Sequence, residues 1–173
     1  MEGRVIAGNF SMSLNAIVYC DCVEKQRLKV PHPRPELLFI DDTGYPNIRS
    51  NDPHDEDLHD QWEAQNPCSH EHFHLVERWL GNVASVGEIR QKLEQLSEHP
   101  SIVYPVLTSK VVYDGSHSGD FLAGEEIVHL RDEVARLRRI DDSGSDGTQW
   151  NDFLSKLEDL ISGSLSVRKP ISF

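Results

Sequence analysis

Basic residues are scarce in this 173-residue chain: 17 Lys and Arg stand against 29 Asp and Glu, which gives a net charge of −12. Nucleic acids and anionic membrane surfaces bind proteins through basic faces, so this balance argues against both as partners. No apolar run approaches the roughly 20 residues that span a bilayer. The segment Met1–Ser11 holds one basic residue and no extended apolar stretch, so it does not resemble a signal peptide. These shortages predict a cytoplasmic protein.

Cysteine is scarce too. Cys20, Cys22 and Cys68 are an odd number of thiols, which leaves no complete disulfide framework, and a bridge within Cys-x-Cys would be strained. The pattern favours a reducing compartment such as the cytosol. The chain also lacks a Walker loop, a Gly-x-Gly-x-x-Gly turn and a Gly-x-Ser-x-Gly elbow, so no common motif names a reaction.

Hydrophobic periodicity predicts short strands early in the chain and longer helices later. Strands are predicted at Leu14–Cys20, Arg27–Val30, Glu36–Ile40, Ile102–Tyr113 and, as a final edge strand, Ser166–Phe173. Helices are predicted from Asp52-Pro53 to Asn66, at Val83–Ser97, at Glu125–Arg139 and at Thr148–Ser162, while Ser69–Leu80 fits either a strand or a helix. This order predicts a poorly ordered leader over residues 1–12 and a single α+β domain over residues 13–173. The domain would have a small, mainly antiparallel sheet packed by about four helices.

Two of these helices carry recognisable start signals. Asp52 is suited to an N-cap and Pro53 to the first helical position, where its missing N–H costs nothing. Ser85 and Glu88 have the spacing of a capping box at the start of the second helix.

The three cysteines and a histidine-rich segment form one candidate metal site. Cys20 and Cys22 are two residues apart on a predicted strand, so both thiols would point to one face. Thiolates and imidazoles are the ligands that zinc prefers, and Cys20, Cys22, Cys68 and His70 would make a closed Cys3His site. Cys68, His70, His72 and His74 share the same two-residue spacing, so His72 or His74 could replace one ligand. The alternative is that the cysteines are small buried hydrophobes beside an exposed histidine-rich segment.

A second candidate site lies in the glycine-bracketed segment from Gly115 to Asp120. A loop histidine near a carboxylate can act as a general base, so His117 and Asp120 could serve Cys20 or Cys22 as nucleophile. The alternative is that the glycines shape a turn and that Asp120 or Ser118 helps to cap the next segment of the chain.

Acidic residues are concentrated in Asp41–Gln65, where eight acids and one base, Arg49, account for −7 of the total charge. The calcium-loop and His-Glu-x-x-His patterns are missing, so the run indicates a solvated helix face or an electrostatic docking surface. The residues of that candidate surface are Asp52, Asp55, Glu56, Asp57, Asp60 and Glu63.

Several short motifs, taken in order, resemble a family of small uncharacterised bacterial proteins. They are Tyr19-Cys20-Asp21-Cys22, Cys68-Ser69-His70-Glu71, Leu80-Gly81-Asn82, Lys110-Val111-Val112-Tyr113, Gly115-Ser116-His117-Ser118-Gly119-Asp120 and Lys169-Pro170-Ile171. The resemblance runs from about Ser13 to the end and brings no established activity. In size and acidity the chain is also similar to immunity proteins that neutralise bacterial toxins.

Two functions are therefore predicted. The first is a non-enzymatic bacterial protein that binds another protein, of the immunity type, and covers a basic toxin domain with its acidic face. The second is a metal- or thiol-dependent enzyme of unknown reaction, centred on Cys20, Cys22, Cys68, His70 and His117.

Overall fold

The computed structural model describes residues 13–97, 103–113, 117, 119–141 and 148–173. In chain order the elements are β1 (Ser13–Tyr19), β2 (Leu38–Ile40), β3 (Pro46–Ile48), α1 (Pro53–Glu63), β4 (His74–Asn82), α2 (Val83–Leu96), β5 (Phe121–Leu122), α3 (Glu125–Asp141), α4 (Thr148–Val167) and β6 (Ile171–Ser172). Three short helical turns complete them: η1 (Pro35–Leu37), η2 (Glu71–Phe73) and η3 (Leu107–Val111).

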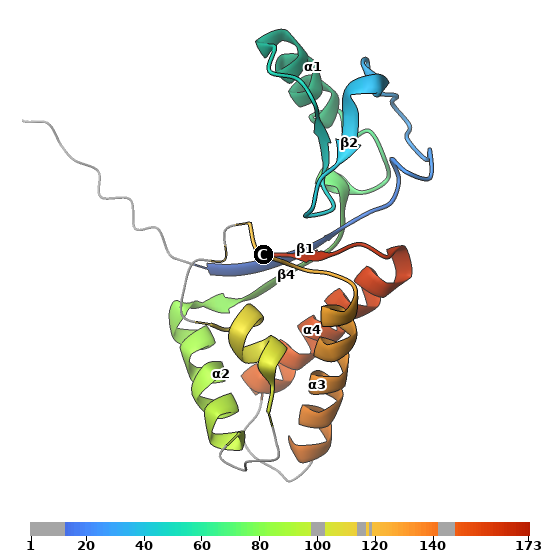
Figure 1. Cartoon of the computed structure of the whole chain (residues 1–173). Coiled ribbons are helices and arrows are strands. Elements are labelled where there is room, and N and C mark those ends of the chain that lie inside the picture. The colour runs from blue at the N-terminus through green and yellow to red at the C-terminus, as the bar shows by residue number, and fades with distance from the viewer. Residues whose placement is uncertain (1–12, 98–102, 114–116, 118, 142–147) are drawn as a thin grey trace, which may run out of the picture.

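The larger sheet has the strand order β4-β1-β6-β5, and its neighbouring strands are antiparallel. Strands β2 and β3 form a separate antiparallel pair. Helices α2, α3 and α4 lie on one side of the larger sheet, and the segment carrying α1 and β2 lies on the other (Figure 1). We call residues 20–73 the N-terminal lobe and these three helices the helical layer. The predicted α+β fold, with its small antiparallel sheet and four helices, is confirmed.

The molecule has two hydrophobic cores of unequal size. The larger core lies between the sheet and the helical layer and includes Val18, Leu93, Leu130 and Leu157. The smaller core belongs to the N-terminal lobe, and its buried members are Cys20, Cys22, Trp62, Cys68 and Phe73. Three of its five fully buried residues are therefore cysteines, and the hydrophobic residues packed around them, such as Val23, Leu28, Val30, Leu38 and Tyr45, are only partly buried.

The predicted helices are confirmed with small changes at their ends. Asp52 caps α1 by accepting the backbone N–H of His54 at 3.0 Å, and Pro53 opens the helix. The cap of α2 differs from the prediction, because Asn82 rather than Ser85 accepts the capping N–H, at 2.9 Å from Ser85. Helix α4 extends five residues beyond the predicted end, to Val167.

The predicted strand Ile102–Tyr113 is wrong: its described part, residues 103–113, contains no strand, and residues 105–111 are helical. The reason is a tertiary cap: the buried Glu133 carboxylate on α3 accepts the N–H groups of Val106 and Leu107 at 3.0 and 2.9 Å. These are N–H groups that a helix start leaves without a partner. A carboxylate from a distant helix thus overrides the local β preference.

Two further strand predictions need correction. Arg27–Val30 forms no strand and follows the turn that ends at Gln26. The C-terminal strand exists as β6, but it lies between β1 and β5 and is not at the edge.

Helix α4 contacts the sheet closely at Gly163. A Cβ atom on Gly163 would lie 2.6 Å from Cγ2 of Val76 in β4, closer than carbon atoms can pack. None of the helices in the described part of the chain has the length and apolar character needed to cross a bilayer.

Candidate metal centre

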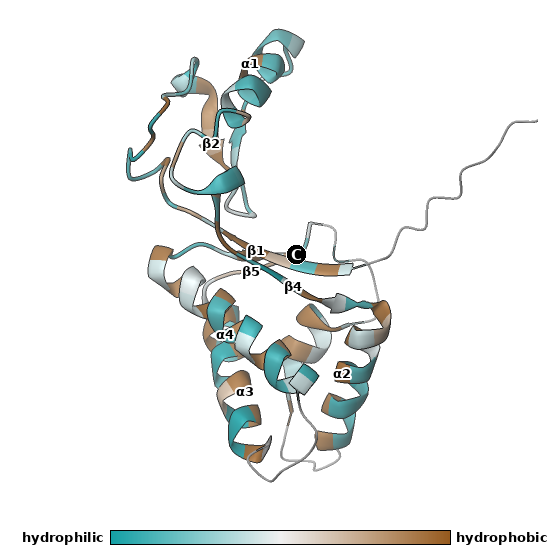
Figure 2. Ribbon diagram, turned by 180° about the vertical axis from the view of Figure 1, so that it is seen from behind, coloured by the Kyte–Doolittle hydropathy of each residue, from teal (hydrophilic) through white to brown (hydrophobic). Residues whose placement is uncertain are grey.

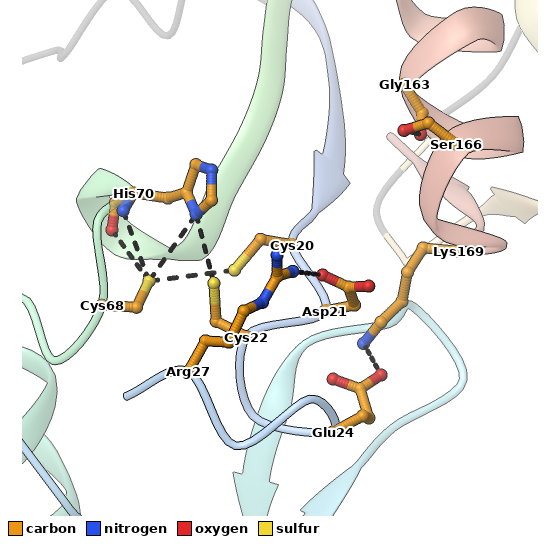
Figure 3. Close-up of polar contacts among 10 residues, drawn as sticks. All are labelled: Cys20, Asp21, Cys22, Glu24, Arg27, Cys68, His70, Gly163, Ser166 and Lys169. Carbon is orange, nitrogen blue, oxygen red and sulfur yellow. Dashed lines mark hydrogen bonds and ion pairs between the residues drawn. The ribbon is translucent and has the colours of Figure 1, made fainter. Parts of the chain in front are cut away.

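Cys20, Cys22, Cys68 and His70 converge in the N-terminal lobe, on the two segments that leave β1 and enter β4 (Figure 3). Cys20 and Cys22 follow the end of β1, and Cys68 and His70 precede η2. One ligand atom from each of the four side chains lies within 4.8 Å of the other three. The three cysteines are buried and His70 is half-buried, so the four residues form a cluster that could bind a metal ion.

Backbone hydrogen bonds hold the two ligand segments side by side. The N–H of Cys20 donates to the Phe73 carbonyl at 2.8 Å, which continues the β1–β4 pairing. Farther into the lobe, the N–H of Lys29 donates to the Pro67 carbonyl at 2.7 Å, one residue before Cys68. The ligands therefore lie on two loops that continue the pairing of β1 with β4 beyond the ends of the strands.

Three of the six distances between the ligand atoms are close to those of a tetrahedral site. With metal–sulfur and metal–nitrogen bonds of about 2.3 and 2.0–2.1 Å, a tetrahedral zinc site has sulfur–sulfur edges of about 3.8 Å and sulfur–nitrogen edges of about 3.6 Å. The Sγ atoms of Cys20 and Cys68 are 3.8 Å apart. His70 Nδ1 is 3.4 Å from Cys22 Sγ and 3.8 Å from Cys68 Sγ.

The electrostatics of the free thiols favour the protonated form. Burial is the largest cause that raises the pKa of Cys20 and of Cys22 above the ordinary value for a thiol. The His70 N–H, 3.3 Å from Cys68 Sγ, is a donor that stabilises a thiolate. Protonated thiols are poor nucleophiles, whereas a divalent cation displaces their protons and takes the thiolates as ligands.

His72 and His74 lie outside the cluster. His72 has a left-handed backbone (φ 47°) in η2, which breaks the two-residue alternation. Its Nδ1 is 3.8 Å from Glu63, and His74 Nδ1 is 3.0 Å from Glu77. The assumption that Cys20 and Cys22 share a strand face is also wrong, because β1 ends at Tyr19 and the thiols converge from a turn.

His117 and Asp120 lie close together, with Nδ1 and Oδ2 3.8 Å apart. Among the described residues, the rings in contact with His117 are Tyr113 and Phe173, with centroids 4.2 and 5.8 Å away. No described contact connects His117 with Cys20 or Cys22, so the geometry gives no support to a Cys–His–Asp catalytic set.

The acidic residues of α1 divide into two groups. Asp52, Glu56, Asp57 and Asp60 are exposed, and α1 is mostly hydrophilic in Figure 2. Asp55 is buried, and its two carboxylate oxygens accept hydrogen bonds from Arg34 at 3.0 Å and Ser50 at 2.7 Å. Glu63 is partly buried beside Tyr45, whose pKa is raised by burial and by a hydrogen bond with Glu63.

A buried histidine pair was not foreseen from the sequence. His59 Nδ1 on α1 lies 3.3 Å from Nε2 of His32. His32 Nδ1 accepts the Arg34 N–H at 3.1 Å, so the neutral ring carries its proton on Nε2 and donates it to His59. Burial is the main cause that lowers the pKa of His59. The spacing of Asp55, His59 and Trp62 along one helix face was the signal available in the sequence.

Lys169 is a second residue that sequence reasoning missed. It is buried, and its ammonium donates to the Gly44 carbonyl at 2.9 Å and pairs with Glu24 at 2.5 Å (Figure 3). Glu24 belongs to the turn that follows the Cys20–Cys22 segment. Lys169 therefore connects the end of α4 with the lobe that carries the Cys20, Cys22, Cys68 and His70 cluster.

Comparison of the chain with models of known protein families, with curated proteins and with solved structures gives no match. The four-residue cluster and the exposed charges therefore have to be interpreted from their own chemistry.

Proposed function

We propose that the chain is a cytoplasmic bacterial protein without enzymatic activity that binds another protein, and that a structural zinc ion holds its N-terminal lobe. Its role would be that of an immunity protein, which covers a basic toxin domain with the acidic face of α1. The observation that carries the proposal is the four-ligand cluster on which the α1-bearing lobe is built.

The ligand set supports a structural ion. Three thiolates and one imidazole complete the tetrahedral coordination of zinc, whereas catalytic zinc keeps a position open for water or substrate. The buried sulfur atoms also leave little access for a substrate. A metal- or thiol-dependent enzyme stays a prediction that no geometric feature of the cluster favours.

The charge arrangement on α1 supports an interaction surface. Asp52, Glu56 and Asp60 recur at every fourth position, so they lie along one helix face, and like charges at that spacing destabilise a helix. Asp60 is also in the half of the helix where the macrodipole disfavours acids, and the last turn holds no basic residue. Helix stability explains Asp52, which is the N-cap, but it does not explain Asp60, whereas attraction of a basic partner accounts for the whole row of charges.

Metal analysis of the purified protein tests the zinc site. We expect one zinc per chain that survives dialysis, and its loss in Cys68→Ser and His70→Ala. His72→Ala and His74→Ala are matched controls from the same segment and should keep the metal. A protein that contains no zinc after expression in zinc-supplemented medium would refute this part of the proposal.

Co-expression with a candidate toxin and capture of the partner test the interaction. A variant combining Asp52→Asn, Glu56→Gln, Asp57→Asn and Asp60→Asn should lose affinity and the salt dependence of association, while Asn at position 52 keeps the helix cap. The matched control neutralises four exposed acids of the helical layer and its entry, namely Glu88, Glu94, Glu125 and Asp132. Equal affinity and salt dependence in both variants would refute the acidic docking surface.

A further inference from the structure

A small cavity of about 250 Å³ lies where η3, β5 and the end of β6 meet. Three aromatic side chains line it, namely Tyr113, Phe121 and Phe173, together with the carboxylate of Asp120. We call these four residues the aromatic cavity. Its volume is below the about 300–1,000 Å³ of sites for drug-sized ligands, so it suits a single side chain better than a cofactor.

The carboxylate in the aromatic cavity is held in a fixed orientation. The Tyr113 hydroxyl donates to Oδ2 of Asp120 at 2.5 Å, and the Phe173 N–H donates to the Asp120 carbonyl at 2.9 Å. Pairing of Phe121 with Ser172 fixes the neighbouring strand. Within the described part of the chain, Oδ1 of Asp120 receives no hydrogen bond, so it is available to a ligand.

The neighbours of Asp120 that the structure describes do not neutralise its negative charge. His117 Nδ1 is 3.8 Å away, but burial lowers the pKa of His117 from its ordinary 6.5, which leaves the ring neutral at neutral pH. Lys110 also lines the cavity, yet its ammonium lies 3.7 Å from the Glu126 carboxylate, which offsets its charge. The Asp120 side chain is 44% exposed, so a ligand can reach it.

We propose that the aromatic cavity binds a cationic side chain, lysine or arginine, presented by the basic protein partner. Aromatic faces attract cations through the ring quadrupole, and a carboxylate adds charge-assisted hydrogen bonds. The identity of the ligand as part of a protein rests on the function proposed above, whereas the recognition of a cation rests on the cavity alone. The site gives the interface an anchored contact in addition to the diffuse charge of α1.

Titration of the ¹⁵N-labelled full chain with small amides tests the site directly. N-acetyl-arginine amide and N-acetyl-lysine amide should shift the backbone signals of Asp120, Phe121 and Phe173 and bind at least about tenfold more tightly than neutral N-acetyl-glutamine amide. Asp120→Asn should weaken binding of the cationic amides by at least about tenfold, while Asp42→Asn, the loss of one exposed charge in the lobe, should have no effect.

Two further variants separate recognition from folding. Tyr113→Phe keeps the ring and the carboxylate and should keep binding, whereas a purely structural Asp120 would make this variant as defective as Asp120→Asn. Phe121→Ala removes a ring that is 37% exposed, so it should fold normally and still bind the cationic amides at least about threefold more weakly.

Equal binding of the three amides would overturn the proposal, as would signal shifts confined to other parts of the chain or unchanged affinity in both Asp120→Asn and Phe121→Ala. The fourfold α1 variant should bind the amides like the unmodified protein, because its changes lie outside the cavity. The fourfold variant could also lose its toxin partner while no form of the protein binds the amides. That result would refute the cation site in the cavity and would still support the proposed function.

Discussion

Removal of the proposed zinc ion should unfold the N-terminal lobe and leave the helical layer folded. The two parts have separate cores, and the core of the lobe contains only two buried apolar residues, Trp62 and Phe73, beside the three cysteine ligands. With the proposed ion gone, the thiols no longer tie the segment after β1 to the segment before β4. The larger core contains none of these ligands, so its packing does not change.

The size of the effect follows from the ligand set and the small core. Burial of an aromatic side chain contributes up to about 3 kcal/mol, so Trp62 and Phe73 together supply about 6 kcal/mol. A structural zinc contributes an apparent 10–16 kcal/mol to the stability of small zinc modules, which is about twice the contribution of the two aromatic residues. Even if the ion contributed only about 4 kcal/mol, about a third of the value in zinc modules, its loss would raise the population of the open lobe about a thousandfold.

Hydrogen exchange measured by mass spectrometry locates the change. After chelation, peptides from residues 20–73 should lose protection by at least about a thousandfold, including the Lys29 amide that bonds Pro67. Peptides from α3 and α4 should keep theirs. Cys68→Ser should reproduce the effect without a chelator, and His72→Ala, which spares the ligand set, should not.

Unchanged protection of the lobe, once metal analysis confirms complete removal, would refute this reasoning, because Trp62, Phe73 and the partly buried residues around them would then hold the lobe without the ion. Equal loss of protection in the lobe and in α3 and α4 would also refute it, since the two cores would then unfold as one unit.

Three other changes have defined outcomes, each measured as the free energy of unfolding in urea. Gly163→Ala should destabilise by about 1–3 kcal/mol, because overpacking against Val76 outweighs the gain of about 1 kcal/mol in helix propensity. Stability should fall as the pH drops below 6.5, because the unfolded chain takes up protons on His59 and His117 more readily than the folded chain does, and His59→Asn should remove the His59 part of this slope. Lys169→Met should cost about 1–3 kcal/mol, less than a fully buried pair, because Glu24 is 38% exposed.

Matched controls accompany these changes. Gly163→Ala combined with Val76→Ala should show a favourable coupling of at least about 1 kcal/mol, and simple additivity would contradict the close contact. His54→Asn on the exposed side of α1 should leave the pH slope unchanged, and an equal flattening would contradict the role of His59. Lys156→Met removes an ion pair within α4 and should cost at most about 0.5 kcal/mol, so a loss as large as that of Lys169→Met would contradict a special role for the buried lysine.

Helices were predictable wherever the signal was local. The cap at Asp52 and the apolar spacing of α3 and α4 depend on residues within a few positions of each other. The helical turn near Leu107 was not predictable, because its cap is Glu133, which is 26 positions away. Hydrophobic periodicity depends only on the residues within a segment, so it cannot predict a hydrogen bond from a residue on another helix.

The candidate sites show the same division. Residue type identified Cys20, Cys22, Cys68 and His70, although the strand geometry invoked to gather them was wrong. The pairing of β1 with β4, which joins segments about 60 positions apart in the chain, brings the four side chains together. Likewise His117 and Asp120 stood out as a local pair, but the Phe173 ring reaches them only through the pairing of β5 with β6.

The C-terminal segment explains why motifs so far apart belong to one structure. At its start, Lys169 contacts the Gly44 carbonyl and Glu24 in the lobe. Position 44 requires glycine, because its φ is +89° and a Cβ atom there would lie 3.2 Å from Cδ of Pro170. Strand β6 then pairs with β1 in the middle of the sheet, and Phe173 ends in the aromatic cavity. One short segment thus contacts the N-terminal lobe, the sheet and the cavity in turn. Loss of Lys169 should therefore loosen the lobe while the proposed zinc ion stays bound, which distinguishes this cause of lobe opening from loss of the ion.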